Sequence, residues 1–129
     1  MELAAVEDWL SAYGRAWETM DPDAAVELFT EDATYRETPF EETMRGREAI
    51  HAYWAEIPDY HKDISFGSEV LMVDGDRAMA HWWVSLFRVK TGERTKSDGI
   101  FLLEFEGGAG RCRSLREWWH IGPEPPAGG

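Results

Sequence analysis

Apolar side chains in the first part of the chain recur at helical spacing. Between residues 3 and 20 they are Leu3, Val6, Leu10, Tyr13, Trp17 and Met20. Steps of three and four place them on one stripe, which predicts an amphipathic helix. Asp21 as N-cap and Pro22 at the first helical position predict a second helix that runs to about Phe29. Residues 46–57 repeat the spacing and predict a third helix, ended by the following proline.

From residue 64 onward the pattern changes to that of strands. Four strand-length runs follow one another, at residues 64–73, 77–89, 94–105 and 111–121. Their links are short and contain glycine, so we expect successive antiparallel hairpins. A shorter strand is predicted at residues 33–37. The Gly/Pro-rich residues 122–129 predict a flexible tail.

These elements predict one α+β domain over residues 1–121, with three N-terminal helices packed on one face of a curved antiparallel or mixed sheet. The run 78–87 is apolar at both alternating positions. A sheet with one solvated face alternates instead, so the second face is expected to be covered too. With no helix left over, the pattern predicts a homodimer formed through the sheet.

Charge narrows the expected partners. The 129 residues include 25 Asp and Glu against 13 Lys and Arg, a net charge of −12, which repels phosphate backbones and argues against nucleic acid. No apolar run approaches the roughly 20 residues of a membrane span, and the N-terminus lacks the pattern of a signal peptide. We therefore expect a cytoplasmic protein with no membrane partner. Its single cysteine, Cys112, excludes an internal disulfide.

The last predicted strand contains an acid between large apolar residues. Read as a strand, Leu115, Glu117 and Trp119 share one face. The opposite face carries Arg116, Trp118 and His120. Because an acid is costly to bury unless it is paired or used, Glu117 is either a pocket acid or an edge carboxylate paired with a nearby arginine.

Other chemistry is not indicated by the sequence. The histidines are residues 51, 61, 81 and 120, and no pair has metal-ligand spacing on one helix face. The glycine-rich segment 107–110 joins two strands and precedes no helix, so it is a hairpin and not a nucleotide site. We expect neither a metal nor a cofactor.

Four segments together suggest a family. They are Tyr13-x-x-x-Trp17-x-x-x-Asp21, Leu28-Phe29-x-x-Asp32-Ala33, Gly46-x-x-Ala49-Ile50-x-x-Tyr53-Trp54 and Arg116-Glu117-Trp118-Trp119. With the order of elements, they resemble the nuclear-transport-factor-two-like fold in its SnoaL-like branch, over residues 3–121. The resemblance implies a cone-shaped barrel with a pocket between helices and sheet. This fold hosts isomerases, cyclases, hydrolases, dehydratases and non-catalytic binders, so it does not fix the reaction.

Within that family, the ketosteroid isomerases imply roles for three residues. Tyr13 would donate to a substrate oxyanion, or else is a core tyrosine. Glu37 stands near their general base, or else belongs to an acidic loop. Asp98 is a third candidate acid, although its place depends on strand register.

The limonene epoxide hydrolases, also similar, place a catalytic carboxylate where Glu117 stands. They need an acid–Arg–acid arrangement around a water, which the strand 94–105 does not supply. The predicted substrate-binding residues are Trp17, Tyr53, Trp54, Trp83, Phe101, Leu115 and Trp119.

The favoured hypothesis is a cofactor-independent acid–base enzyme of isomerase or cyclase type, acting on a small apolar ring-containing molecule. The alternative is a non-catalytic ligand-binding or dimerisation module, and a weaker one is an epoxide hydrolase variant. The partners of Glu37 and Glu117 discriminate between them. Acids that face a pocket without arginine partners favour the enzyme, and acids tied to arginines favour the binder.

Overall fold

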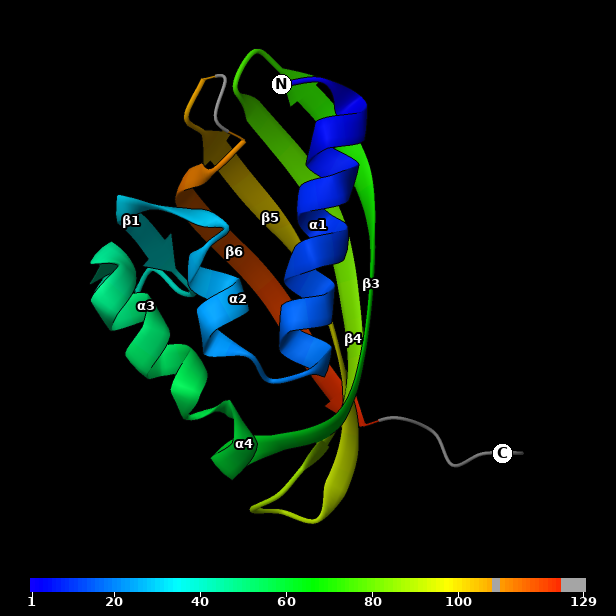
Figure 1. Cartoon of the computed structure of the whole chain (residues 1–129). Coiled ribbons are helices and arrows are strands. Elements are labelled where there is room, and N and C mark those ends of the chain that lie inside the picture. The colour runs from blue at the N-terminus through cyan, green and yellow to red at the C-terminus, as the bar shows by residue number, and fades with distance from the viewer. Residues whose placement is uncertain (108–109, 124–129) are drawn as a thin grey trace.

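A computed structural model describes residues 1–107 and 110–123, and Figure 1 shows helices lying against one face of a long curved sheet. The elements are α1 (Leu3–Glu18), α2 (Pro22–Val26), β1 (Phe29–Arg36), β2 (Met44–Arg45), α3 (Gly46–Ala55), α4 (Ile57–Tyr60), β3 (His61–Asp74), β4 (Arg77–Arg88), β5 (Glu93–Phe105) and β6 (Cys112–Pro123). The predicted α+β class is confirmed.

The sheet has the strand order β2-β1-β6-β5-β4-β3 and is mixed. Strands β3 to β6 pair as successive antiparallel neighbours, as the short links predicted. Strand β1 instead runs parallel to β6, with Arg36 opposite Arg116. The edge strands β2 and β3 do not pair within the described ranges, so the sheet is curved but open, and does not close into the expected barrel.

Helix α1 buries the middle of the predicted stripe against the sheet, whereas Leu3 at its start is 54% exposed and Met20 lies beyond its end. Val6, Leu10 and Tyr13 are at most 2% exposed, because the steps of three and four keep them on the covered face. Figure 1 shows α1 lying over the sheet beside β3 and β4, while α3 stands at the opposite side near β1. Between them, Phe101 and Leu115 from the sheet complete the core at 0% exposure.

Two predicted helix ends were wrong. The second helix ends at Val26 and not near Phe29, which begins β1 and is fully buried. The carbonyl of Leu28 explains this, because it accepts hydrogen bonds from the backbone N–H of Cys112 (2.8 Å) and from Nε1 of Trp9 (2.9 Å). The chain must therefore be extended here to join β6.

Pro58 does not simply end the third helix. Helix α3 stops at Ala55, and Pro58 lies in the first turn of α4. A proline is tolerated there because the N–H groups of a first turn have no helical partner.

The C-terminal strand reaches further than predicted. Strand β6 extends to Pro123, into the expected tail 122–129, of which residues 124–129 lie outside the described residues. Residues 108–109 of the predicted glycine-rich hairpin lie outside them as well. No helix in the described ranges is long and apolar enough to cross a membrane.

Gly99 lets three strands approach closely behind the helices. A Cβ built on it would lie against the backbone carbonyl of Trp118 and 2.8 Å from Cζ2 of Trp82. The backbone can only be this close because glycine has no side chain.

We expect Gly99→Ala to lower the free energy of unfolding by about 1–3 kcal/mol, the usual cost of overpacking. Gly122→Ala is the matched control and should change stability little, because Gly122 also lies on a strand but a Cβ added to it would meet nothing within 4 Å. Urea denaturation of both variants measures this, and equal midpoints would contradict the packing role assigned to Gly99.

Candidate functional site

A cavity of about 220 Å³ lies between the helices and the inner face of the sheet. It is lined by Tyr13, Trp17, Tyr35, Glu37, Tyr53, Trp54, Ile57, His61, Trp82, Leu86, Arg88, Ser97, Glu117, Trp119 and Ile121. Most of the predicted site residues therefore meet here, from elements as distant in sequence as α1 and β6. The cavity contains both acids favoured by the sequence, Glu37 and Glu117.

Two predicted site residues lie on the opposite face of the sheet, which corrects their expected placement. Trp83 and Asp98 stand opposite each other in the β4–β5 register, and both point away from the cavity. Asp98 accepts from Nε2 of His81 at 3.0 Å. It borders a second hollow of about 400 Å³, which reaches Glu37 and Glu117 from the outer side. The physical reason is parity: Gly99 faces inward, so its neighbour Asp98 faces outward.

Phe101 and Leu115 lie behind the cavity wall and do not line it. Both are fully buried, and the Phe101 ring packs 5.2 Å from that of Tyr13 and 5.3 Å from that of Trp82. They hold the cavity-lining rings in place.

The two acids are brought together by the parallel pairing of β1 with β6. Arg36, the last residue of β1, pairs with Arg116, so Glu37, which follows the end of β1, lies beside Glu117 of β6. Their carboxyl groups are hydrogen-bonded to each other, and the hydroxyl of Tyr53 also donates to Glu37. Glu37 is partly buried, whereas Glu117 is only 7% exposed.

Burial gives the acids different proton affinities. Burial raises the pKa of Glu117 well above its usual value, and the neighbouring charge of Glu37 raises it further. Burial also raises the pKa of Glu37, but the hydrogen bonds from Tyr53 and Glu117 oppose this. Glu37 therefore ionises first, while Glu117 keeps its proton and donates it to Glu37.

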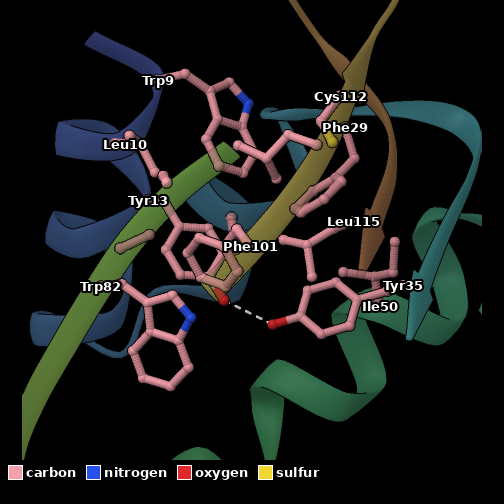
Figure 2. Packing of buried hydrophobic residues seen from close by; sticks show 14 of the residues in the cluster. Trp9, Leu10, Tyr13, Phe29, Tyr35, Ile50, Trp82, Phe101, Cys112 and Leu115 are labelled. Carbon is pink, nitrogen blue, oxygen red and sulfur yellow. Dashed lines mark hydrogen bonds between the residues drawn. The ribbon is translucent and has the colours of Figure 1, made fainter. Parts of the chain in front are cut away.

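A pair of tyrosines stands next to the acids. The hydroxyl oxygens of Tyr13 and Tyr35 are 2.6 Å apart and buried, and Figure 2 shows the two side chains meeting end to end. Burial raises the pKa of both well above the usual value, so both remain neutral. One hydroxyl donates to the other, which leaves one O–H able to donate into the cavity.

Several buried polar atoms around the cavity have no partner. Among the described residues these are Nε1 of Trp17, Trp54 and Trp82 and Nδ1 of His61. Burial and the charge of Arg88 lower the pKa of His61 to about 4, so its ring is neutral. Because buried polar groups are nearly always hydrogen-bonded, these atoms mark places where water or a polar group of a bound molecule would be held.

The nearby arginines are not bound to the acids. Arg36 donates to the carbonyls of Thr38 (3.3 Å) and Pro39 (3.1 Å), and Arg116 lies over the ring of Trp118. Within the part of the chain that the structure describes, no three His, Cys, Asp or Glu side chains converge as metal ligands.

The sequence reasoning missed Tyr35, Trp82 and Arg88, although two of them left a signal. Tyr35 precedes Glu37 by two residues and so shares its strand face. In β4, polar His81 and Ser85 share the parity of Trp83, which marks that face as the outer one and Trp82 as the inner one.

Comparison with known proteins gives the family. The sequence profile of the SnoaL-like domain matches residues 10–112, which is most of the chain. The chain belongs to the SnoaL-like domain family. No curated protein sequence matches it.

Solved structures with this SnoaL-like fold carry several named activities. A proposed isomerase from Bacillus subtilis has a TM-score of 0.81 at 20% identity, over 93% of this chain and 90% of that one. The epoxide hydrolase/cyclase-like enzyme SalBIII, of pyran ring formation in salinomycin, has a TM-score of 0.78 at 21% sequence identity. The match covers 92% of this chain and 95% of that one. A type 2 hexachlorocyclohexane dehydrochlorinase has a TM-score of 0.79 at 13% sequence identity, over 95% of this chain and 88% of that one. At these identities the likeness shows the fold alone.

The raised pKa of Glu117 predicts how stability depends on pH. The folded state holds this proton above pH 4.5, where the unfolded state releases it, so unfolding becomes easier as pH rises from 4.5 towards the folded pKa. Glu117→Gln removes this pH-dependent decrease in the free energy of unfolding, because glutamine does not ionise. We expect the difference in unfolding free energy between variant and wild type to grow with pH, by up to about 1.4 kcal/mol per pH unit.

Urea unfolding from about pH 5 to about pH 8 measures this difference. Glu42→Gln, on an exposed loop, is the control and should follow the wild type throughout. A difference that stays constant with pH would show that Glu117 is not protonated by the fold.

Proposed function

We propose that this SnoaL-like domain is a cofactor-independent acid–base enzyme of isomerase or cyclase type, acting on a small organic molecule with an apolar ring. The observation that carries the proposal is the contact between Glu37 and Glu117. One acid is protonated and the other is available as a base, inside an aromatic cavity and with no arginine bonded to either in the described residues. Such pairs with separated pKa values are typical of acid–base sites.

Glu37 is the proposed general base. It removes a proton from the carbon next to a substrate carbonyl, and the electron pair of the C–H bond moves onto the carbonyl oxygen. A hydrogen bond from the Tyr53 hydroxyl orients its carboxylate. Proton transfer by a positioned side chain contributes about 10²–10⁴-fold to a rate.

Glu117 and the tyrosine pair are the proposed donors to the oxyanion. Before substrate binds, the Glu117 proton bonds to Glu37, and a bound carbonyl oxygen would accept it instead. The free O–H of the Tyr13–Tyr35 pair supplies a second donor. Donors held in place before the reaction stabilise the developing charge without reorganising.

Two outcomes follow from the enolate formed in this way. If Glu37 returns the proton to a different carbon, a double bond moves and the product is an isomer. If the enolate carbon attacks a second carbonyl of the same molecule, a new C–C bond forms and the π bond of that carbonyl breaks. The alkoxide formed there takes the proton from Glu37, and the product is a ring with a hydroxyl group. Neither needs a metal or cofactor.

The cavity walls support a ring-shaped substrate. Four indole rings, of Trp17, Trp54, Trp82 and Trp119, line the space together with the acids. Flat aromatic faces pack against rings and exclude water, which strengthens electrostatic interactions inside.

The alternatives have less support. The hypothesis of a non-catalytic binding module predicts that the acids are tied to arginines. Arg36 instead donates to backbone carbonyls. An epoxide hydrolase variant needs a water between two carboxylates, whereas Glu37 and Glu117 are bonded directly to each other. The similar structures include proteins named as an isomerase and a dehydrochlorinase, and a proton-transfer site is in keeping with those names.

Hydrogen exchange tests the proposal without knowledge of the true substrate. The enzyme is incubated in D₂O with a panel of cyclic ketones, and deuterium at the carbon next to the carbonyl is followed by NMR. We expect wild type to accelerate exchange for at least one ketone, and Glu37→Gln to slow it by about 10²–10⁴-fold.

The control for exchange is again Glu42→Gln, which should retain the wild-type rate. If Glu37→Gln exchanges as fast as wild type, or if a ketone binds in the cavity without any exchange, the proposed mechanism is refuted.

We also infer that the outer face of the sheet pairs with a second copy of the chain. This face carries exposed apolar side chains from three strands, among them Met72, Met79, Trp83 and Trp118. Large apolar patches on one face are typical of interaction sites.

Substitution of Trp118 tests this association. Trp118 is 49% exposed on the sheet face, and Val89 is 44% exposed beyond the end of β4. We expect wild type and Val89→Glu to sediment as dimers and Trp118→Glu to shift towards the monomer, because the glutamate would be buried without a partner. A monomer mass for wild type at all concentrations would remove the inference.

A further inference from the structure

The cavity separates its charges along the strands. Glu117 stands in register with Phe101, which in turn pairs with Ala80 in the first half of β4. Arg88 is the last residue of β4 and pairs with His61 at the start of β3. Both Glu117 and Arg88 line the same cavity, so it has an acid end and an arginine end.

Arg88 is the one cationic side chain among the described residues that line this cavity, because His61 is neutral. In the described ranges, no carboxylate forms an ion pair with it. Its Nε donates to Oγ1 of Thr95 at 3.0 Å, which fixes the plane of the guanidinium group. The two Nη groups, with four N–H donors, are left for another acceptor.

Further polar groups surround the arginine end. Ser97, a residue only 6% exposed, lines the cavity there. Among the described residues, Nδ1 of His61 and Nε1 of Trp17 are buried without a partner. These groups come from β5, β3 and α1, and all three residues line the cavity.

The guanidinium of Arg88 and the indole N–H of Trp17 are therefore donors at this end, and the Ser97 hydroxyl can also donate. Two indole N–H groups deeper in the cavity, on Trp54 (1% exposed) and Trp82 (2% exposed), are unpartnered too. Figure 2 shows the Trp82 indole on the side of the core where the two tyrosine hydroxyls meet. An apolar ligand would leave all of these groups unsatisfied, at a cost for each buried one.

We propose that Arg88 and Ser97 bind an anionic group of the substrate, a carboxylate, at the end of the cavity remote from Glu37 and Glu117. This rests on the proposed function and names the class of its substrate: a ring-containing organic acid. The planar guanidinium fork matches the two oxygens of a carboxylate.

The separation of the two ends has a physical reason. A substrate carboxylate placed beside ionised Glu37 would be repelled, and would also hinder the loss of a proton from the neighbouring carbon. Held at Arg88, the negative group orients the molecule while its neutral, reacting part reaches the acids. The burial and lowered pKa of His61 fit this, because a neutral ring can face the arginine without repulsion.

Binding of a matched pair of probes tests the proposal. Cyclohexanecarboxylate and the neutral cyclohexanecarboxamide have the same ring and nearly the same shape, and binding is followed by calorimetry or by tryptophan fluorescence. We expect wild type to bind the carboxylate about tenfold or more tightly than the amide, as a charge-assisted hydrogen bond gives.

Variants assign that preference to Arg88. Arg88→Gln should remove it, Arg88→Lys should keep part of it, and Ser97→Ala should weaken carboxylate binding. Arg113→Gln, an exposed arginine of β6, is the control and should leave it unchanged. If Arg88→Gln does not fold, Arg88→Lys takes its place, and a preference that Arg88→Lys leaves undiminished overturns the assignment to Arg88.

The test of the anion site at Arg88 can fail or succeed independently of the test of Glu37 as the base. Glu37→Gln should bind the carboxylate at least as tightly as wild type even though its exchange activity is lost. Equal affinity of wild type for the two probes, or a preference that survives Arg88→Gln, overturns the anion site whether or not Glu37 proves to be the base. Loss of exchange without loss of the preference supports both.

Discussion

The proton held between Glu37 and Glu117 is the interaction on which the site depends. Two ionised carboxyl groups in contact and away from water would repel each other strongly, so this arrangement is stable only with a proton on one of them. Burial decides which, because Glu117 is the more enclosed of the two. The neutral tyrosine pair and the Tyr53 hydroxyl add donors but no charge. Between the pKa values of the two acids, the acid end of the cavity therefore carries one negative charge and one available proton.

The backbone enforces that contact through a pairing that is not local. Strand β1 lies parallel to β6 and ends at Arg36, so Glu37 leaves the strand where Glu117 passes. Gly99, on the next strand, leaves room for the large rings of Trp82 and Trp119 beside the acids. The packing and the candidate site thus share the same few positions, and a change that shifts β6 against β1 would separate the acids even if both side chains remained.

Local patterns in the sequence predicted most of the fold and about half of the site. The stripe of α1 and the four long strands follow from periodicity, and the inward direction of Glu117 follows from alternation within β6. The choice of Trp83 over Trp82 failed because both are apolar, and only polar His81 and Ser85 mark the outer face. The parallel partner of β1 could not be found, since it depends on contacts with a strand far away along the chain, and periodicity holds no information on which strands pair.

The arrangement of charge also limits the kind of reaction. A site with one base, one proton donor and neutral hydroxyls can take a proton from carbon and give it back, and it ends each turnover in the protonation state in which it began. Isomerisation and ring closure meet that condition. Hydrolysis would in addition need a water positioned by charged groups, so the contact between the two carboxyls supports the proposed proton transfer rather than hydrolysis. The same reasoning supports the proposed place of a negative substrate group at Arg88, because a second negative charge beside the proposed base would hinder removal of a proton from carbon.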